Sequence, residues 1–228
     1  MHDVCLVGGH ALHITHYAPM FITLEGPEGG GKSSQIRLLY DFLQAQGIAV
    51  RLTREPGGTS IGDEIRACVH NVQNTAMCPE AELLLYSASR AQLVWEVIRP
   101  SLAAGSVVLC DRYYDSTLAY QGYGRGLDLT ALRQITHFAT GGLKPDLTIL
   151  LDIDVTVGLA RRTNGGVEMN RLDLETVAFH QRVRQGYHQL AVQEPARWVI
   201  IDAGRPSEVV QADLRAIVVA RFSSVPDA

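Results

Sequence analysis

The stretch GPEGGGKS at residues 26–33 combines four glycines, a lysine and a serine. It fits the pattern G-x-x-x-x-G-K-[ST], in which glycines let successive backbone N–H groups turn inward toward the oxygens of a polyphosphate. Lys32 would reach the outer phosphates, and Ser33 would bind or orient Mg²⁺. The sequence therefore predicts a nucleotide site rather than a simple glycine-rich turn. The site residues are Gly26, Pro27, Glu28, Gly29, Gly30, Gly31, Lys32, Ser33 and Ser34.

The residues on either side of this loop have the pattern of a strand and a helix. The apolar run MFITLE precedes it, and Ile36, Leu39 and Leu43 follow it at helical spacing. Similar patterns predict further strands at 48–52, 106–110, 147–153 and 198–202, and helices at 32–46, 60–70, 79–103, 128–139, 154–163, 173–193 and 206–221. Strands rich in Val, Ile and Leu that alternate with helices predict an α/β fold with a five-stranded parallel sheet covered by helices on both faces.

The composition limits the possible partners. The chain has 228 residues and a formal charge of -4, so no general basic surface favours nucleic acid or an anionic membrane. No apolar run approaches the roughly 18 residues that a spanning helix needs. The four cysteines have neither metal-ligand spacing nor the pattern of a disulfide framework, which favours a cytoplasmic location.

The first 19 residues differ in composition from the rest and contain His2, His10, His13 and His16. The last three could share a helix face and bind a metal, but a loose extension or a mis-assigned start ahead of Met20 is the favoured interpretation. We therefore expect an extension at 1–19, one domain at 20–222 and a tail at 223–228. Within that domain, the helix at 81–98 is apolar on more than one face, which predicts full burial or cover by another subunit.

Four further stretches make the chain resemble the thymidylate kinase (dTMP kinase) family from Met20 to about Ala220. They are TREPGGT at 53–59, YSASRAQ at 86–92, DRYYDSTLAYQGYGRG at 111–126 and RRTNGGVEMNRLDLE at 161–175. The resemblance implies the P-loop nucleoside monophosphate kinase fold. It also implies transfer of a phosphoryl group from ATP to dTMP with Mg²⁺, and a homodimer.

The same resemblance assigns roles to individual residues. The dTMP site would contain Glu28, Arg54, Tyr86, Arg90, Arg112, Ser116, Thr117, Tyr120 and Gln121. Arg112 would bridge the two sets of phosphates, Tyr86 would stack on the base where phenylalanine is usual in the family, and Tyr120 would exclude a 2′-hydroxyl. Asp111 ends an apolar strand, which is a usual place for a carboxylate that positions Mg²⁺. Asp152 ends another strand, but Arg112 beside Asp111 favours Asp111 together with Ser33.

The basic residues of the 161–173 region resemble the bacterial members of the family, whose lid carries the arginines. Arg161 would bind ATP, whereas Arg162 and Arg171 would join Lys32 and Arg112 as catalytic cations. Asn170 stands where the family usually has aspartate. A solvent-facing helix end is the alternative for Arg161, since cations commonly lie at helix C-termini.

Three other activities share parts of this pattern. A deoxynucleoside kinase would need a carboxylate base near a neutral hydroxyl, for which Glu28 is the candidate, and TREPGG would be out of place there. Another P-loop nucleoside monophosphate kinase is a related possibility. A GTPase-type switch would need a guanine-reading stretch like N-K-x-D after a late strand, and the sequence has none.

Overall fold

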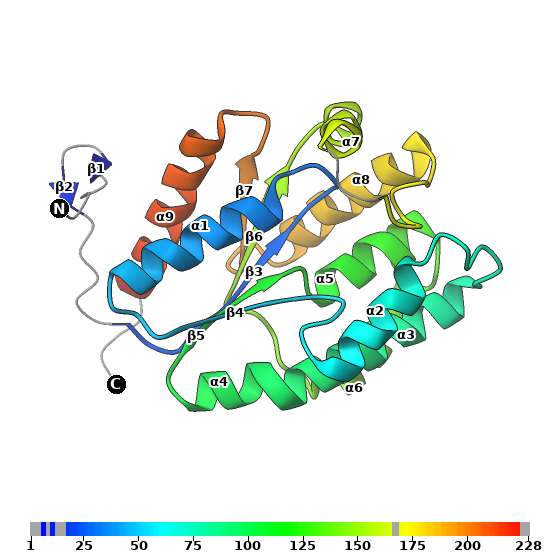
Figure 1. Cartoon of the computed structure of the whole chain (residues 1–228), viewed down its shortest axis with the longest axis horizontal. Helices are drawn as coiled ribbons and strands as arrows, with labels where there is room; N and C mark the ends of the chain where they lie inside the picture. Colours follow the sequence, from blue (N-terminus) through cyan, green and yellow to red (C-terminus); the bar gives the residue numbers. More distant parts are fainter. Residues whose placement is uncertain (1–5, 8–9, 12–16, 166–168, 224–228) are drawn as a thin grey trace.

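The computed structural model describes residues 6–7, 10–11, 17–165 and 169–223. Its centre is a five-stranded parallel sheet in the order β4-β5-β3-β6-β7 (Figure 1). The strands are β3 (Phe21–Glu25), β4 (Val50–Arg54), β5 (Val107–Asp111), β6 (Leu147–Asp152) and β7 (Trp198–Asp202). This arrangement confirms the predicted fold class. The short strands β1 (Leu6–Val7) and β2 (His10–Ala11) pair antiparallel outside this sheet.

Helices cover both faces of the sheet because neighbouring strand residues point in opposite directions. On one face, Ile22 packs against α1 (Lys32–Ala45) and α9 (Ser207–Ser223). On the other, Phe21 packs in the core that includes α3 (Pro79–Leu93) and α8 (Val177–Gln193). The remaining helices are α2 (Ser60–His70), α4 (Arg99–Ala103), α5 (Tyr114–Thr117), α6 (Leu129–Thr140) and α7 (Val155–Asn164).

Two π-helical segments continue regular helices. The first, η1 (Val94–Ile98), links α3 to α4, so the predicted helix over 79–103 is one continuous rod. The second, η2 (Leu118–Gly124), extends α5. The sequence did not predict a helix here. Its residues are buried on nearly every side, so no 3.6-residue alternation of polar and apolar positions was present to reveal it.

Other boundaries differ by a few residues. The predicted strand at 48–52 lies at Val50–Arg54, and the helix predicted from 173 begins at Val177. The later start follows from local hydrogen bonds, because Asn170 accepts from the backbone of Leu172 and Asp173, and Thr176 caps the helix. No helix within the described ranges is long and apolar enough to span a bilayer. The alternative of a histidine metal site at the N-terminus rests on side chains that lie outside the described residues.

Candidate active site

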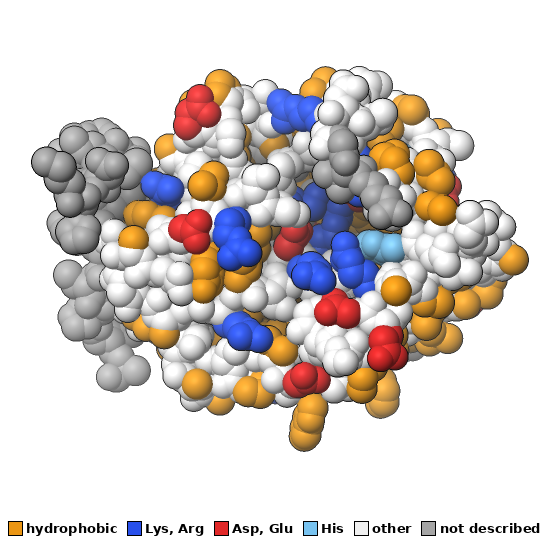
Figure 2. Space-filling view, in the orientation of Figure 1, with side chains coloured by type: hydrophobic (Ala, Val, Ile, Leu, Met, Phe, Trp, Pro, Cys, Tyr) orange, Lys and Arg blue, Asp and Glu red, His pale blue; other side chains and the backbone are white. Residues whose placement is uncertain are grey.

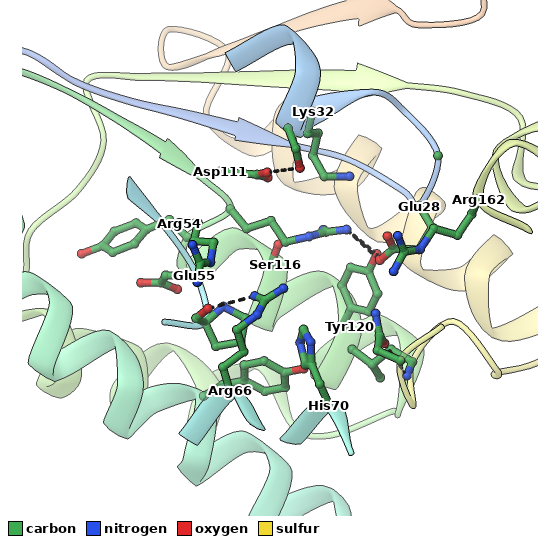
Figure 3. Close-up of a pocket in the computed structure, with 18 of the residues that line it drawn as sticks. Glu28, Lys32, Arg54, Glu55, Arg66, His70, Asp111, Ser116, Tyr120 and Arg162 are labelled. Carbon is green, nitrogen blue, oxygen red and sulfur yellow. Dashed lines mark hydrogen bonds and ion pairs between the residues drawn. The ribbon is translucent and has the colours of Figure 1, made fainter. Parts of the chain in front are cut away.

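A pocket of about 400 Å³ opens at the carboxyl ends of β3, β4 and β5. Figure 2 shows lysine and arginine side chains gathered around this hollow. In Figure 3, Lys32 and Asp111 lie toward one end of the pocket, whereas Arg66 and His70 lie at the other. The predicted residues that line it are Glu28, Gly29, Gly31, Lys32, Ser33, Ser34, Arg54, Tyr86, Arg90, Asp111, Arg112, Ser116, Thr117, Tyr120, Gln121, Arg161 and Arg162.

The glycine-rich loop packs closely against its neighbours. Gly26 has a φ of 139° and Gly29 has a φ of 71°, both of which disfavour a side chain. A Cβ added at Gly29 would also overlap the backbone of Gly158 on α7, and one at Gly158 would overlap the carbonyl oxygen of Glu28. The loop therefore lies directly on the helix that carries Arg161 and Arg162.

Lys32 is held inside the curl of this loop. Its Nζ donates to the carbonyl oxygens of Gly26 at 3.0 Å and Pro27 at 2.7 Å. Gly26 and Pro27 thus hold the lysine side chain in place through their backbone. Burial and the nearby Arg112 lower the pKa of Lys32 to about 8. A polyphosphate bound beside it would favour the charged form and raise that pKa again.

Ser33 and Asp111 meet beside Lys32. The Ser33 hydroxyl donates to Oδ2 of Asp111 at 2.6 Å, joining the first turn of α1 to the end of β5. A hydroxyl and a carboxylate are hard oxygen donors of the kind that Mg²⁺ prefers. Their position at the polyphosphate end of the pocket fits the predicted metal site.

Arg112 lies at the centre of the pocket. Its guanidinium binds Glu28 at 2.7 Å and donates to the Gly26 carbonyl, Ser116 and Tyr120 at 3.0 to 3.2 Å. Burial alone would raise the pKa of Glu28, but the charges of Arg112 and Lys32 outweigh it and lower this pKa to about 2. Glu28 is therefore ionised at neutral pH, and a strongly held carboxylate of this kind is a poor proton acceptor.

A buried carboxylate that the sequence analysis missed supports Arg112 from behind. Glu25 accepts hydrogen bonds from the Tyr113 N–H at 2.7 Å, from Ser116 at 2.6 Å and from Tyr187 at 3.0 Å. Burial raises the pKa of Glu25 to about 7. Since Ser116 also contacts Arg112, Glu25 fixes the group that orients this arginine. The sequence signal that could have identified Glu25 is its position, since it is a carboxylate at the end of β3 directly before the glycine-rich loop.

The far end of the pocket contains Arg90 and Glu55, another residue that the sequence analysis did not select. Arg90 is 1 % exposed, and its Nη2 lies 2.7 Å from Oε2 of Glu55. Within the described part of the chain, Nη1 of Arg90 has no hydrogen-bond partner. Burial raises the pKa of Glu55 to about 7 even though Arg90 opposes the shift. Arg90 thus keeps an uncommitted donor beside the pocket.

Arg66 and His70, both on α2, also line the pocket and were not predicted. Arg66 donates to the Pro56 carbonyl at 2.9 Å, and Arg54 binds Asp63 at 3.1 Å. Burial and Arg66 lower the pKa of His70 to about 4, so the imidazole is neutral at pH 7. Arg66 therefore adds one positive charge to the site beyond those expected from the motifs.

The three arginines expected in the lid have different surroundings. Arg161 and Arg162 belong to the last turn of α7, and Arg161 donates to the Ala203 carbonyl at 2.9 Å. Arg162 faces the pocket, and its Nε and Nη2 donate to Asp173 at 3.1 and 2.9 Å. Arg171 is not brought to the pocket, since it bonds to Glu82 and to the Val69 carbonyl.

The family model described as thymidylate kinase matches residues 24–214 of this chain. The chain belongs to the thymidylate kinase family. It is 52 % identical over 217 residues to a thymidylate kinase of Roseiflexus sp. (strain RS-1), covering 90 % of this chain and 96 % of that protein. It is 54 % identical over 190 residues to that of Thermomicrobium roseum, covering 83 % of this chain and 90 % of that protein.

A crystal structure of thymidylate kinase from Ehrlichia chaffeensis has the same fold, with a TM-score of 0.72 and 30 % sequence identity. It covers 88 % of this chain, which itself covers 99 % of that structure. Membership of the thymidylate kinase family confirms the resemblance stated from the motifs and the P-loop nucleoside monophosphate kinase fold.

Asn170 is one of two departures from the usual thymidylate kinase pattern. Its side-chain oxygen accepts from the N–H groups of Leu172 and Asp173 at 2.8 and 3.2 Å. This turn brings the Asp173 carboxylate onto the Asn170 N–H at 2.8 Å and onto Arg162. The carboxylate contact in this segment is therefore made by Asp173, with Asn170 shaping the turn.

Tyr86 is the second departure from the thymidylate kinase pattern. Its hydroxyl is buried beside the pocket, and no hydrogen-bond partner for it occurs among the described residues. A buried polar group without a partner costs about 1–3 kcal/mol. We expect Tyr86→Phe to raise the free energy of unfolding by about 1 kcal/mol, seen as a higher Tm in calorimetry without nucleotide.

Tyr120→Phe is the matched control for this prediction. The Tyr120 hydroxyl donates to Glu28 at 2.8 Å, so its removal breaks a made hydrogen bond and should lower the Tm. Equal decreases in both variants would show that the Tyr86 hydroxyl is also paired.

Proposed function

We propose that this chain transfers the γ-phosphate of ATP to dTMP, giving ADP and dTDP. The observation that carries the proposal is the position of Arg112 between the polyphosphate loop and the far end of a single pocket, in a member of the thymidylate kinase family. One guanidinium at this place can contact both the donor and the acceptor phosphates.

The chemistry of the acceptor explains what the site must provide. A phosphate monoester has a second pKa of about 6, so it is already a nucleophile at pH 7 and needs no general base. The low pKa of Glu28 fits this requirement, because this carboxylate serves to hold Arg112 and Tyr120. A deoxynucleoside kinase, the alternative, would need a base that accepts a hydroxyl proton.

The main barrier is the repulsion between the two nucleotides, which together carry about six negative charges. Mg²⁺, held by Ser33 and Asp111, would neutralise part of this charge. Lys32, Arg112 and Arg162 supply fixed cations at the site, so that catalysis consists of positioning and charge stabilisation.

The remaining predicted residues have supporting roles in this proposal. Arg54 holds the dTMP phosphate, Tyr86 stacks on the base, and Tyr120 limits the space at the sugar. Arg161 contacts ATP, and Arg171 holds the lid segment. The other binding residues are Gly26, Pro27, Gly29, Gly30, Gly31 and Ser34 for ATP, and Arg90, Ser116, Thr117 and Gln121 for dTMP.

A coupled assay that reports ADP formation tests the proposal. Purified protein is given ATP, Mg²⁺ and each of the common ribo- and deoxyribonucleoside monophosphates in turn, with thymidine included. We expect dTMP to have the largest kcat/KM and thymidine to give no turnover. Turnover of thymidine without turnover of dTMP would establish the deoxynucleoside kinase instead.

We also propose a cytoplasmic homodimer. An exposed apolar stripe supports the dimer: Leu84 is 57 % and Trp95 is 78 % exposed, on the helix formed by α3 and η1. Ala88 and Ala91 lie between them at intervals of four, three and four residues, which places all four on one helix face. Small residues between large ones allow a second helix to approach closely.

Trp95→Glu should therefore shift the protein from dimer to monomer in sedimentation velocity, because a buried unpaired charge at the interface is strongly unfavourable. Val192→Glu is the control, since Val192 is 79 % exposed on α8 and lies outside the stripe. A wild-type protein that sediments as a monomer, or a Trp95→Glu dimer, would contradict this assembly.

We propose the domain organisation as residues 20–222 for the catalytic domain with its lid at about 161–173, an extension at 1–19 and a tail at 223–228. Tyr17 contacts the domain: its hydroxyl accepts from the Ala49 N–H at 3.0 Å, and its ring packs on Phe222. The last residues of the extension, from Tyr17 onward, therefore pack on the catalytic domain.

A further inference from the structure

Glu82 is a buried carboxylate on α3 that belongs to none of the motifs. Its side chain is 1 % exposed. Oε1 accepts from Nε2 of Gln121 at 2.7 Å and from Nε of Arg125 at 3.2 Å. Oε2 accepts from Arg125 and from Arg171. One carboxylate therefore joins η2, the lid segment and the helix that carries Tyr86.

The charge of Glu82 determines which end of the Gln121 amide faces it. Burial alone would raise the pKa of Glu82, but the hydrogen bonds from Arg125, Gln121 and Arg171 lower it, so the group is ionised at neutral pH. An ionised carboxylate only accepts hydrogen bonds. The NH₂ end of the Gln121 amide must therefore face Glu82, and its oxygen must face away.

The Gln121 oxygen is available to a ligand. Gln121 lines the pocket, and its side-chain oxygen accepts no hydrogen bond from any described residue. Arg90 lines the same pocket with its Nη1 unpartnered. Gln121 thus offers one acceptor and Arg90 one donor to a bound base. These match a base edge with an N–H next to a carbonyl, as in thymine, and mismatch one with a lone pair next to an amino group, as in cytosine.

We propose that Glu82 is a positioning residue that fixes the Gln121 amide with its oxygen toward the base, and thereby makes the site select thymine over cytosine. This inference rests on the proposed function, because it concerns the acceptor of that reaction. Glu82 acts through Gln121 and does not itself touch the nucleotide.

A purely structural role for Glu82 predicts a different result. Glu82 also holds Arg125 and Arg171, so its replacement would disturb the lid segment and lower activity toward every acceptor by a similar factor. Selectivity between two acceptors separates the two roles, since a general loss cancels in the ratio of their kcat/KM values.

The experiment compares dTMP with 5-methyl-dCMP, which keeps the methyl group and changes only the hydrogen-bonding edge. Glu82→Gln can donate as well as accept, so the Gln121 amide can turn and offer its NH₂ to the base. We expect the ratio of kcat/KM for dTMP over 5-methyl-dCMP to fall at least about 10-fold. Glu175→Gln is the matched control, because Glu175 binds Arg125 at 2.6 Å without contacting Gln121; its ratio should equal that of the wild type.

A second variant keeps the test decisive if Glu82→Gln folds poorly. Gln121→Met removes the amide at similar volume and leaves Glu82 with both arginines, and it should lower the same ratio. An unchanged ratio in Glu82→Gln, or in Gln121→Met, overturns the inference. These outcomes differ from failure of the proposed function, in which the wild type itself would not phosphorylate dTMP.

Discussion

Lys32→Ala should lower kcat at least about 10³-fold, because it removes the cation that meets the outer phosphates of the donor. The variant should still fold. Lys32 makes its described hydrogen bonds to two carbonyl oxygens of its own loop, and its pKa is lowered to about 8. Burial of this charge therefore does not stabilise the fold of the protein without nucleotide.

The measurement is steady-state kinetics of ADP formation, with calorimetry to confirm folding. Lys144→Ala is the matched control: it removes the same side chain from a surface ion pair with Glu194, outside the pocket, and should keep wild-type kinetics. A Lys32→Ala enzyme with near wild-type kcat would show that the loop does not hold the transferred phosphate.

Arg162→Ala should lower kcat at least about 10²-fold while changing KM for dTMP much less. Arg162 reaches the pocket from α7, whereas Arg171 is committed to Glu82, so the structure favours Arg162 as the dominant lid cation. A contact that forms mainly with the transferring phosphoryl group stabilises the transition state more than the bound substrate.

Asp173→Asn extends this test. It loosens the hold on Arg162 without removing the arginine, so it should lower kcat by a smaller factor than Arg162→Ala. Arg51→Ala, at an exposed position on β4 outside the pocket, is the control. If Arg161, Arg162 and Arg171 variants all kept wild-type kcat and raised only KM, the lid would bind substrate without assisting the transfer.

The parts of the site that could be predicted are those encoded by neighbouring residues. The loop at 26–33, its lysine and serine, and the arginines of the TREPGG and DRY stretches lie next to strand ends, whose apolar runs are local signals. Parallel strands then bring these ends to one edge of the sheet, which is why most of the predicted residues share one pocket.

The parts that could not be predicted are buried carboxylates whose partners are distant in sequence. Glu82 meets Arg171, which is 89 residues away, and Glu25 meets Tyr187, which is 162 residues away. A lone glutamate in an apolar segment carries no local sign of such a partner. The same limit explains why Arg171 was expected to act on the phosphates: its residue type was informative, but its direction depends on Glu82.

The contact between Gly29 and Gly158 has a consequence for how this protein can vary. A side chain at Gly29 would need the space that the Gly158 backbone occupies, and a side chain at Gly158 would need the space of the Glu28 carbonyl oxygen. A change at one site therefore cannot be offset by shrinking the other, which is already minimal. Relatives that carry a larger residue at either position must hold this helix farther from the loop. A larger residue at position 29 or 158 in a related sequence therefore indicates a wider spacing between these two backbone segments.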